Sequence, residues 1–279
     1  MKILVTGANG QLGVDIVRLF FEKGHDVVGL GRSQLDITDM EKCKEVIHEI
    51  QPDTVVHCAA YTAVDNAEKD QDNAYLVNAI GTRNVAAAAE SVKAKICYIS
   101  TDYVFDGNSS RPYYEYDNTN PLTVYGKSKR AGEQLIQSLS SRWFIVRTSW
   151  VFGASGNNFV KTMLKLGKER ESLQVVNDQW GSPTFTYDLS LFLEELISTE
   201  KYGIYHASNS GICTWFEFAK AIFEEARMPV IVEPCTTEQF PRPASRPRFS
   251  AMEPMAIRVN GFTPIRDWRE ALRDYLNKL

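Results

Sequence analysis

The sequence has no apolar run long enough to cross a membrane. Its opening segment, Met1–Gly7, contains an apolar stretch far too short for the core of a signal peptide. No later segment approaches the ~18 consecutive apolar residues that a membrane-spanning helix requires. We therefore expect a cytoplasmic protein that does not bind membranes.

Cysteine and histidine are scarce, and neither is arranged as metal ligands usually are. The chain has five cysteines, widely spread and without a CxxC pair. Its four histidines also lack the spacing of metal ligands. This usage predicts reduced, mostly buried thiols and no metal site.

Positive charge is limited as well. The formal net charge of −4 provides no field for holding a polyanion such as DNA, so we expect no nucleic-acid partner. The one local cluster consists of Arg242, Arg246 and Arg248. Arginines so close together suit a small phosphorylated ligand better than a duplex.

What the sequence does contain is an alternation of strand and helix patterns over residues 1–150. Short β-rich runs alternate with longer segments of helical periodicity. The expected strands are Lys2–Thr6, Asp26–Leu30, Thr54–Cys58, Lys95–Ser100 and Trp143–Thr148, and the expected helices are Gln11–Lys23, Met40–Ile50, Asn73–Val92 and Tyr125–Leu139. This order predicts an α/β protein with a Rossmann-type, doubly wound parallel sheet.

The alternation becomes less regular after residue 150. The Pro-rich stretch Pro234–Pro254 also carries large apolar side chains, which predicts an ordered irregular segment rather than a free linker. A helix over Trp268–Leu279 is expected to end the chain. We interpret residues 1–150, completed by part of 185–208, as a dinucleotide-binding domain. Residues 151–279 then form mainly a smaller C-terminal substrate-binding lobe.

A glycine-rich turn follows the first expected strand directly. Gly7, Gly10 and Gly13 have GxxGxxG spacing and open the first expected helix. The first glycine permits a tight turn, the second lets backbone N–H groups approach a pyrophosphate, and the third lets helix and strand pack closely. The helix N-terminus adds partial positive charge. The turn therefore predicts a dinucleotide site.

The residues after the second strand indicate which dinucleotide binds. An acid at this place usually binds the ribose 2′-hydroxyl of NAD, but here the chain reads Gly31-Arg32-Ser33. A guanidinium beside a hydroxyl suits a 2′-phosphate and favours NADPH. A solvated surface arginine is the alternative for Arg32. Asp36 could accept from the adenine amino group or cap the next helix.

A threonine, a tyrosine and a lysine form the candidate catalytic group. Tyr125 is the only tyrosine with a lysine four residues later, at Lys129, which places both on one helix face. A phenol with a pKa near ~10 is a poor acid at neutral pH, and a nearby cation is expected to lower that pKa. Thr101 follows the fourth strand, where parallel sheets bind ligands.

Several runs of sequence resemble the extended short-chain dehydrogenase/reductases, and within them the dTDP-4-dehydrorhamnose reductases. The runs are 59–65 (AAYTAVD), 100–107 (STDYVFDG), 147–153 (RTSWVFG) and 178–184 (DQWGSPT), with a weaker match at 246–250 (RPRFS). The resemblance covers essentially the whole chain. It implies NADPH-dependent reduction of the C4 ketone of dTDP-4-dehydro-L-rhamnose to dTDP-L-rhamnose, for cell-surface polysaccharide synthesis, with NADH as an alternative cofactor.

The resemblance also implies roles for particular residues. Pyrophosphate contacts fall on Gly10, Gln11 and Leu12, adenosine contacts on Asp36 and Ile37, the path to the nicotinamide on Ala60, Tyr61 and Thr62, catalysis on Thr101, Tyr125 and Lys129, and dTDP-sugar contacts on Asp102 and Trp150. A core aromatic is the alternative reading of Trp150.

The chain departs from the family pattern in two places. Some members are metal-bridged dimers using acids on the first helix and near the C-terminus; here Asp15 is present, but Lys278 stands near the C-terminal end. We therefore expect no metal and a monomer or weak homodimer. His57 and Cys58 replace smaller or amide residues, with little expected effect.

Two other functions remain open: a binding subunit resembling the regulatory subunit of methionine adenosyltransferase, and a reductase or epimerase acting on another nucleotide-sugar.

Overall fold

A six-stranded parallel sheet organises the computed structural model, which describes residues 1–279. Its strands lie in the order β10-β5-β4-β3-β1-β2. They are β1 (Lys2–Thr6), β2 (Asp26–Leu30), β3 (Thr54–His57), β4 (Lys95–Thr101), β5 (Trp143–Thr148) and β10 (Gly203–His206). The inner strands are near-continuous apolar runs because helices cover both faces of the sheet. The expected α/β fold with a parallel sheet is confirmed.

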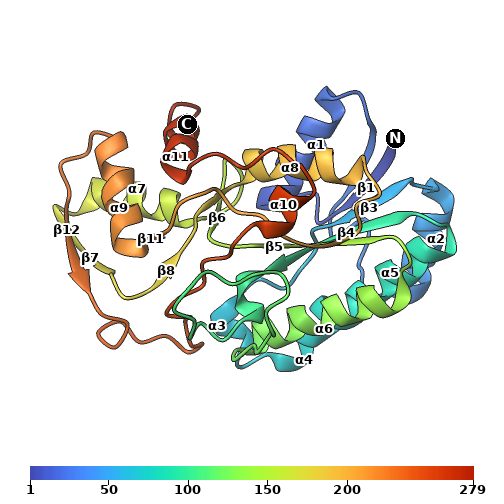
Figure 1. Cartoon of the computed structure of the whole chain (residues 1–279), viewed down its shortest axis with the longest axis horizontal. Coiled ribbons are helices and arrows are strands. Elements are labelled where there is room, and N and C mark those ends of the chain that lie inside the picture. The colour runs from blue at the N-terminus through green and yellow to red at the C-terminus, as the bar shows by residue number, and fades with distance from the viewer.

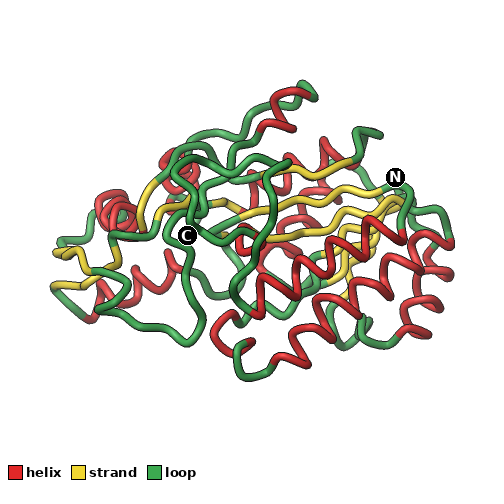
Figure 2. Tube along the Cα trace, turned by 60° about the horizontal axis from the view of Figure 1, so that its bottom comes forward, coloured by secondary structure: helices red, strands yellow, loops and turns green.

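Two helix layers enclose this sheet (Figure 1). One layer consists of α1 (Gln11–Glu22) and α8 (Thr186–Ile197), the other of α2 (Met40–Ile50), α5 (Thr82–Ser91) and α6 (Val124–Leu139). Side chains of β1 alternate between them: Ile3 and Val5 pack toward α1 and α8, and Leu4 packs toward α2 and α5. Figure 2 shows the second layer crossing in front of the strands.

The strand order reverses beside β1. The chain leaves β1 for β2 on one side and later returns through β3 on the other side. In doubly wound sheets, ligands bind outside the carboxyl ends of the strands at such a switch point. The turns after β1 and β3 therefore border the expected ligand site.

A smaller lobe lies beyond the carboxyl edge of the sheet, at the left of Figure 1. Its main elements are α7 (Phe159–Glu169), β7 (Ser172–Val176), α9 (Trp215–Glu225), β12 (Ile231–Cys235) and α11 (Trp268–Leu276), with short pieces β6 (Val151–Phe152), β8 (Trp180–Gly181), β9 (Thr184–Phe185) and β11 (Cys213–Thr214). The short helix α10 (Met255–Val259) packs instead against the edge strand β10 of the sheet. β7 and β12 pair in parallel. Phe152, Phe218 and Leu272 belong to a separate apolar core in this lobe.

The expected helix Asn73–Val92 is three consecutive elements. α4 (Gln71–Tyr75) follows the single turn α3 (Val64–Ala67), and a π-helical segment, Leu76–Gly81, joins α4 to α5. Asn78 in this segment is buried and bonds to both the N–H and the carbonyl of Tyr61. Such π segments are frequent at functional sites.

The Pro-rich segment is ordered, as expected. Its beginning belongs to β12, and its later part is held by bridges from Phe249 to Trp180 and from Met252 to Tyr113. All five cysteines are unpaired, and four of them are buried, which agrees with the expected buried thiols. None of the helices combines the length and the apolar character needed to span a bilayer.

Candidate active site

One cavity of about 1560 Å³ extends along the carboxyl edge of the sheet and into the smaller lobe. Apart from Ser33 and Arg248, every residue that the sequence analysis considered for the site lines it. These residues are Gly7, Gly10, Gln11, Leu12, Gly13, Arg32, Asp36, Ile37, Ala60, Tyr61, Thr62, Thr101, Asp102, Tyr125, Lys129 and Trp150. The fold thus brings together groups that lie up to 143 positions apart in the sequence.

The glycine turn forms the floor of the cavity beside β1. Gly7 has φ +68° and lies so close to β3 that a Cβ would stand 2.7 Å from the backbone nitrogen of Ala59. Gly10 precedes α1 as its N-cap and makes no side-chain cap bond. The first N–H groups of α1 therefore lack a protein side chain as acceptor and suit a phosphate. The turn fits a dinucleotide pyrophosphate.

Arg32 and Asp36 stand where the adenosine end of a dinucleotide would lie. The Arg32 side chain is 87% exposed, with its Nε 3.9 Å from Oδ2 of Asp36. Asp36 accepts hydrogen bonds from the backbone and hydroxyl of Thr38, which lower the pKa of the Asp36 carboxyl. The cap of α2 is Asp39, not Asp36. The helix-cap alternative for Asp36 is therefore wrong.

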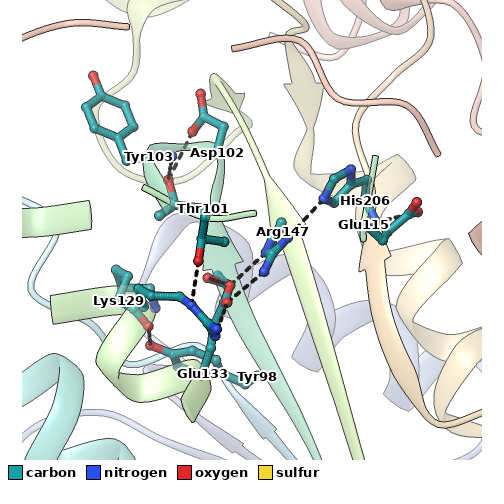
Figure 3. A network of polar contacts seen from close by, with 12 residues as sticks. Tyr98, Thr101, Asp102, Tyr103, Glu115, Lys129, Glu133, Arg147 and His206 are labelled. Carbon is teal, nitrogen blue, oxygen red and sulfur yellow. Dashed lines mark hydrogen bonds and ion pairs between the residues drawn. The ribbon is translucent and has the colours of Figure 1, made fainter. Parts of the chain in front are cut away.

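The three candidate catalytic residues come from β4 and α6. Thr101 is the last residue of β4, and its hydroxyl accepts from the Tyr103 N–H. Thr123 caps α6 by accepting from Gly126, so that Tyr125 lies in the first helical turn. The Lys129 ammonium donates to the Ile99 carbonyl at 2.6 Å (Figure 3). It also stands 4.1 Å from the centre of the Tyr98 ring.

Burial dominates the titration of this group. It raises the pKa of the Tyr125 phenol to about 12; a hydrogen bond with Thr101 opposes the rise, and the Asp102 carboxylate adds to it. The expected lowering of that pKa by Lys129 is not found. Burial lowers the pKa of Lys129 itself to about 7, and the negative charge of Glu133 opposes this fall. A phenol with this pKa stays protonated at neutral pH and can donate a proton.

Asp102 is a buried carboxylate that lines the cavity beside Thr101. Its Oδ1 accepts from the Thr101 hydroxyl at 3.0 Å, and its Oδ2 has no hydrogen-bond partner although the residue is buried. Burial raises the pKa of this carboxyl to about 6, and interactions with the hydroxyls of Ser250 and Thr101 oppose the rise. A buried, unpaired carboxylate oxygen that borders a cavity can accept a hydrogen bond from a ligand.

Trp150 also lines the cavity. It follows β5 with φ +46°, which is rare for a bulky side chain. Such strained backbone is common at functional sites. Its ring stacks on that of Trp215, the first residue of α9. The indole is only half-buried and borders the cavity, so the alternative of a purely core aromatic is not what the structure shows.

The sequence analysis missed part of the lining. Arg242 and Arg246 border the cavity, whereas Arg248 of the same cluster is not among its lining residues. Arg246 donates to Asp65 at 2.8 Å, which lowers the pKa of that carboxyl. The arginine cluster was a usable signal. Trp215 had no sequence signal, because only tertiary packing brings it to the wall.

Asp15 and Lys278, the two residues that bear on a possible metal site, both contact other groups of the protein. Asp15 is buried and bonds to Arg18 and to the hydroxyl of Thr186. The Lys278 ammonium stands 4.5 Å from the centre of the Tyr187 ring. No group of three or more His, Cys, Asp or Glu side chains is arranged to hold a metal ion.

Comparisons with known proteins agree with this geometry. The family model described as "RmlD substrate binding domain" matches residues 1–279. The crystal structure of dTDP-4-dehydrorhamnose reductase from Bacillus anthracis str. Ames in complex with NADP is 49% identical, with a TM-score of 0.98, and the match covers 100% of both chains. The spore coat polysaccharide biosynthesis protein SpsK of Bacillus subtilis is 46% identical over 99% of this chain and 97% of its own length. A dTDP-4-dehydrorhamnose reductase of Aggregatibacter actinomycetemcomitans is 42% identical over 98% of this chain and 97% of its own.

Proposed function

The chain belongs to the dTDP-4-dehydrorhamnose reductase family, and on that premise we propose that it reduces the C4 ketone of dTDP-4-dehydro-L-rhamnose with NADPH. The product is dTDP-L-rhamnose. One observation carries the proposal: a buried Thr101–Tyr125–Lys129 group lines the same cavity as the glycine turn. A proton donor and a dinucleotide site thus share one space that is large enough for two ligands.

The glycine turn and Arg32 are proposed to hold the cofactor. Backbone N–H groups at the start of α1 would bind the pyrophosphate, and the exposed Arg32 guanidinium is free to reach a 2′-phosphate. Ile37 lines the adenosine end, and Ala60, Tyr61 and Thr62 line the path toward Lys129. NADPH supplies a hydride to the ketone carbon when it is bound.

Tyr125 is proposed to complete the reduction by giving its phenolic proton to the ketone oxygen. Its pKa of about 12 keeps it protonated at neutral pH, and the Thr101 hydroxyl can orient the same oxygen. Lys129, one helical turn after Tyr125 on α6, would bind the nicotinamide ribose. Its positive charge also stabilises the phenolate that remains after proton transfer.

The opposite side of the cavity is proposed to bind the nucleotide-sugar. Oδ2 of Asp102 can accept from a sugar hydroxyl, and the exposed part of the Trp150 indole can pack against the sugar ring. Arg242 and Arg246 provide positive charge for the diphosphate. In this proposal residues 1–150 and part of 185–208 bind the cofactor, and residues 151–279 mainly bind the substrate.

The direct test is NADPH oxidation by the purified protein. We expect absorbance at 340 nm to fall when dTDP-4-dehydro-L-rhamnose is added, and to fall much more slowly with UDP- and GDP-linked keto-sugars. Oxidation with a different keto-sugar alone would reassign the substrate. NADPH binding without oxidation of any keto-sugar would indicate a binding subunit instead.

A further inference from the structure

A buried carboxylate lies one helical turn beyond the candidate catalytic lysine. Tyr125, Lys129 and Glu133 follow one another at intervals of four along α6, so all three lie on one face of the helix. The Glu133 side chain is completely inaccessible to solvent. Nothing in the proposed reaction uses it so far.

Glu133 is held by hydrogen bonds on both oxygens (Figure 3). Arg147 of β5 donates to Oε1 and Oε2, each at 2.8 Å, and Ser100 of β4 donates to Oε1 at 2.6 Å. Arg130 donates to Oε2 at 3.1 Å. These bonds fix the carboxylate in one orientation.

The ion pair between Glu133 and Arg147 is not easily explained by stability. Both side chains are almost fully buried, and desolvation of two charges commonly cancels their attraction. A well-packed apolar pair would often be as stable. The position of the pair suggests another role, because Ser100 adjoins Thr101 and the helix carries Lys129. The pair therefore joins β4, β5 and α6 directly behind the candidate catalytic group.

The other groups around Lys129 carry no negative charge at neutral pH. On α6, the Tyr125 phenol is protonated because its pKa is about 12. From the end of β3, burial lowers the pKa of His57 to about 3 and raises that of Cys58 to about 12, so both are neutral. From β4, the Tyr98 ring lies over the ammonium, and burial keeps its phenol protonated. Glu133 is left as the anion that supports the charge of Lys129.

We propose that Glu133 is a positioning residue that keeps the Lys129 ammonium charged and directed at the cofactor and the tyrosine. The inference rests on the proposed function for its catalytic meaning, but the electrostatic link between the two residues can be measured without any substrate. Arg147 and Ser100 act in turn by holding the carboxylate in place. Lys129 lies in a buried site that favours its neutral form, and the anion behind it counteracts that tendency.

The test is the titration of Lys129 in protein labelled with 13C at the lysine Cε, with the signal assigned from Lys129→Arg. Glu133→Gln preserves the shape of the side chain and removes its charge. We expect the Lys129 transition, near pH 7 in the wild type, to move down by roughly one unit or more. Glu133→Asp, which retains the charge, should move it less. Arg130→Gln leaves the Glu133 charge in place and should not lower it.

A second variant covers the case in which Glu133→Gln leaves Arg147 unpaired and unfolds the protein. Glu133→Gln combined with Arg147→Met removes both buried charges, and circular dichroism verifies the fold. In turnover assays, kcat should fall as the pH rises and Lys129 loses its proton. In the neutral variants this fall should begin at a lower pH than in the wild type, while KM for the keto-sugar changes little. An unmoved Lys129 signal in a folded neutral variant would overturn the proposal. A shifted signal in a protein that reduces no keto-sugar would instead contradict the proposed function and leave the link between Glu133 and Lys129 standing.

Discussion

The indole of Trp150 stacks on that of Trp215, with ring centroids 3.6 Å apart and an angle of 11° between their planes. Trp150 leaves the sheet at the end of β5, whereas Trp215 opens α9 in the smaller lobe. The stack therefore connects the two parts of the molecule at the side of the cavity that both residues line. It fixes the wall against which the sugar is proposed to pack.

Loss of this platform should weaken substrate binding. We predict that Trp215→Ala raises KM for the keto-sugar roughly tenfold, because an aromatic pair contributes about 0.5–1.5 kcal/mol beyond its buried area. The Kd for NADPH, measured by fluorescence, should stay near the wild-type value. Trp180→Ala is the matched control, since Trp180 does not line the cavity. Equal effects of the two substitutions would show that the stack has no special role.

Arg32 should determine the preference for NADPH. Its guanidinium is exposed and contacts only Asp36, so it is available to a 2′-phosphate. Arg32→Ala should remove most of the difference in Kd between NADPH and NADH, on the order of 1–3 kcal/mol for charge-assisted bonds. Arg269→Ala, in the smaller lobe, serves as control. An unchanged preference would make Arg32 an ordinary surface residue.

The pKa of Asp102 predicts how substrate binding depends on pH. This carboxyl has a pKa of about 6, so it is an ionised hydrogen-bond acceptor above that value and becomes protonated below it. KM for the keto-sugar should therefore rise as the pH falls through about 6. In Asp102→Asn, KM should be higher than in the wild type and nearly independent of pH over this range. Measurement of KM between pH 5 and pH 8 in both proteins checks this expectation; a pH dependence that survives in the variant would assign it to another group.

The arginine cluster offers an internal comparison. Arg246 lines the cavity and is oriented by Asp65, whereas Arg248 does not line it. Arg246→Ala should raise KM for the dTDP-sugar roughly ten- to a hundredfold, as loss of a charge-assisted bond to phosphate does. Arg248→Ala should have little effect. Inhibition by dTDP alone should weaken in parallel; if both variants bind dTDP equally well, the diphosphate lies elsewhere.

The sequence predicts the sheet well because a parallel sheet buried on both faces leaves a local signal. The strand at Trp143–Thr148 and the turn at Gly7 can be read from a few neighbouring residues. The sequence analysis expects part of 185–208 to complete the first domain, but the place of β10 at the sheet edge and the pairing of β7 with β12 depend on contacts between distant segments. No local pattern reports them.

In the candidate site, too, local sequence predicts some features, whereas others depend on tertiary packing. The interval between Tyr125 and Lys129 places both on one helix face, and the structure brings both into the cavity. The pKa of Tyr125 was expected to fall because a lysine is near, yet burial raises it. Desolvation depends on everything packed around the phenol, which spacing along the chain does not describe. The wall formed by Trp215 escaped prediction for the same reason.

The central claim is that Tyr125 donates the proton in the reduction of the ketone. Tyr125→Phe preserves the ring and removes the proton, so NADPH should bind with nearly the wild-type Kd. The rate of keto-sugar reduction, followed at 340 nm under saturating NADPH, should fall by about 10²–10⁴, as loss of a general acid does. Tyr205→Phe is the control, because Tyr205 is also buried, has a pKa of about 12 and does not line the cavity. Its turnover should remain near normal. Near-wild-type turnover of Tyr125→Phe would contradict the assignment.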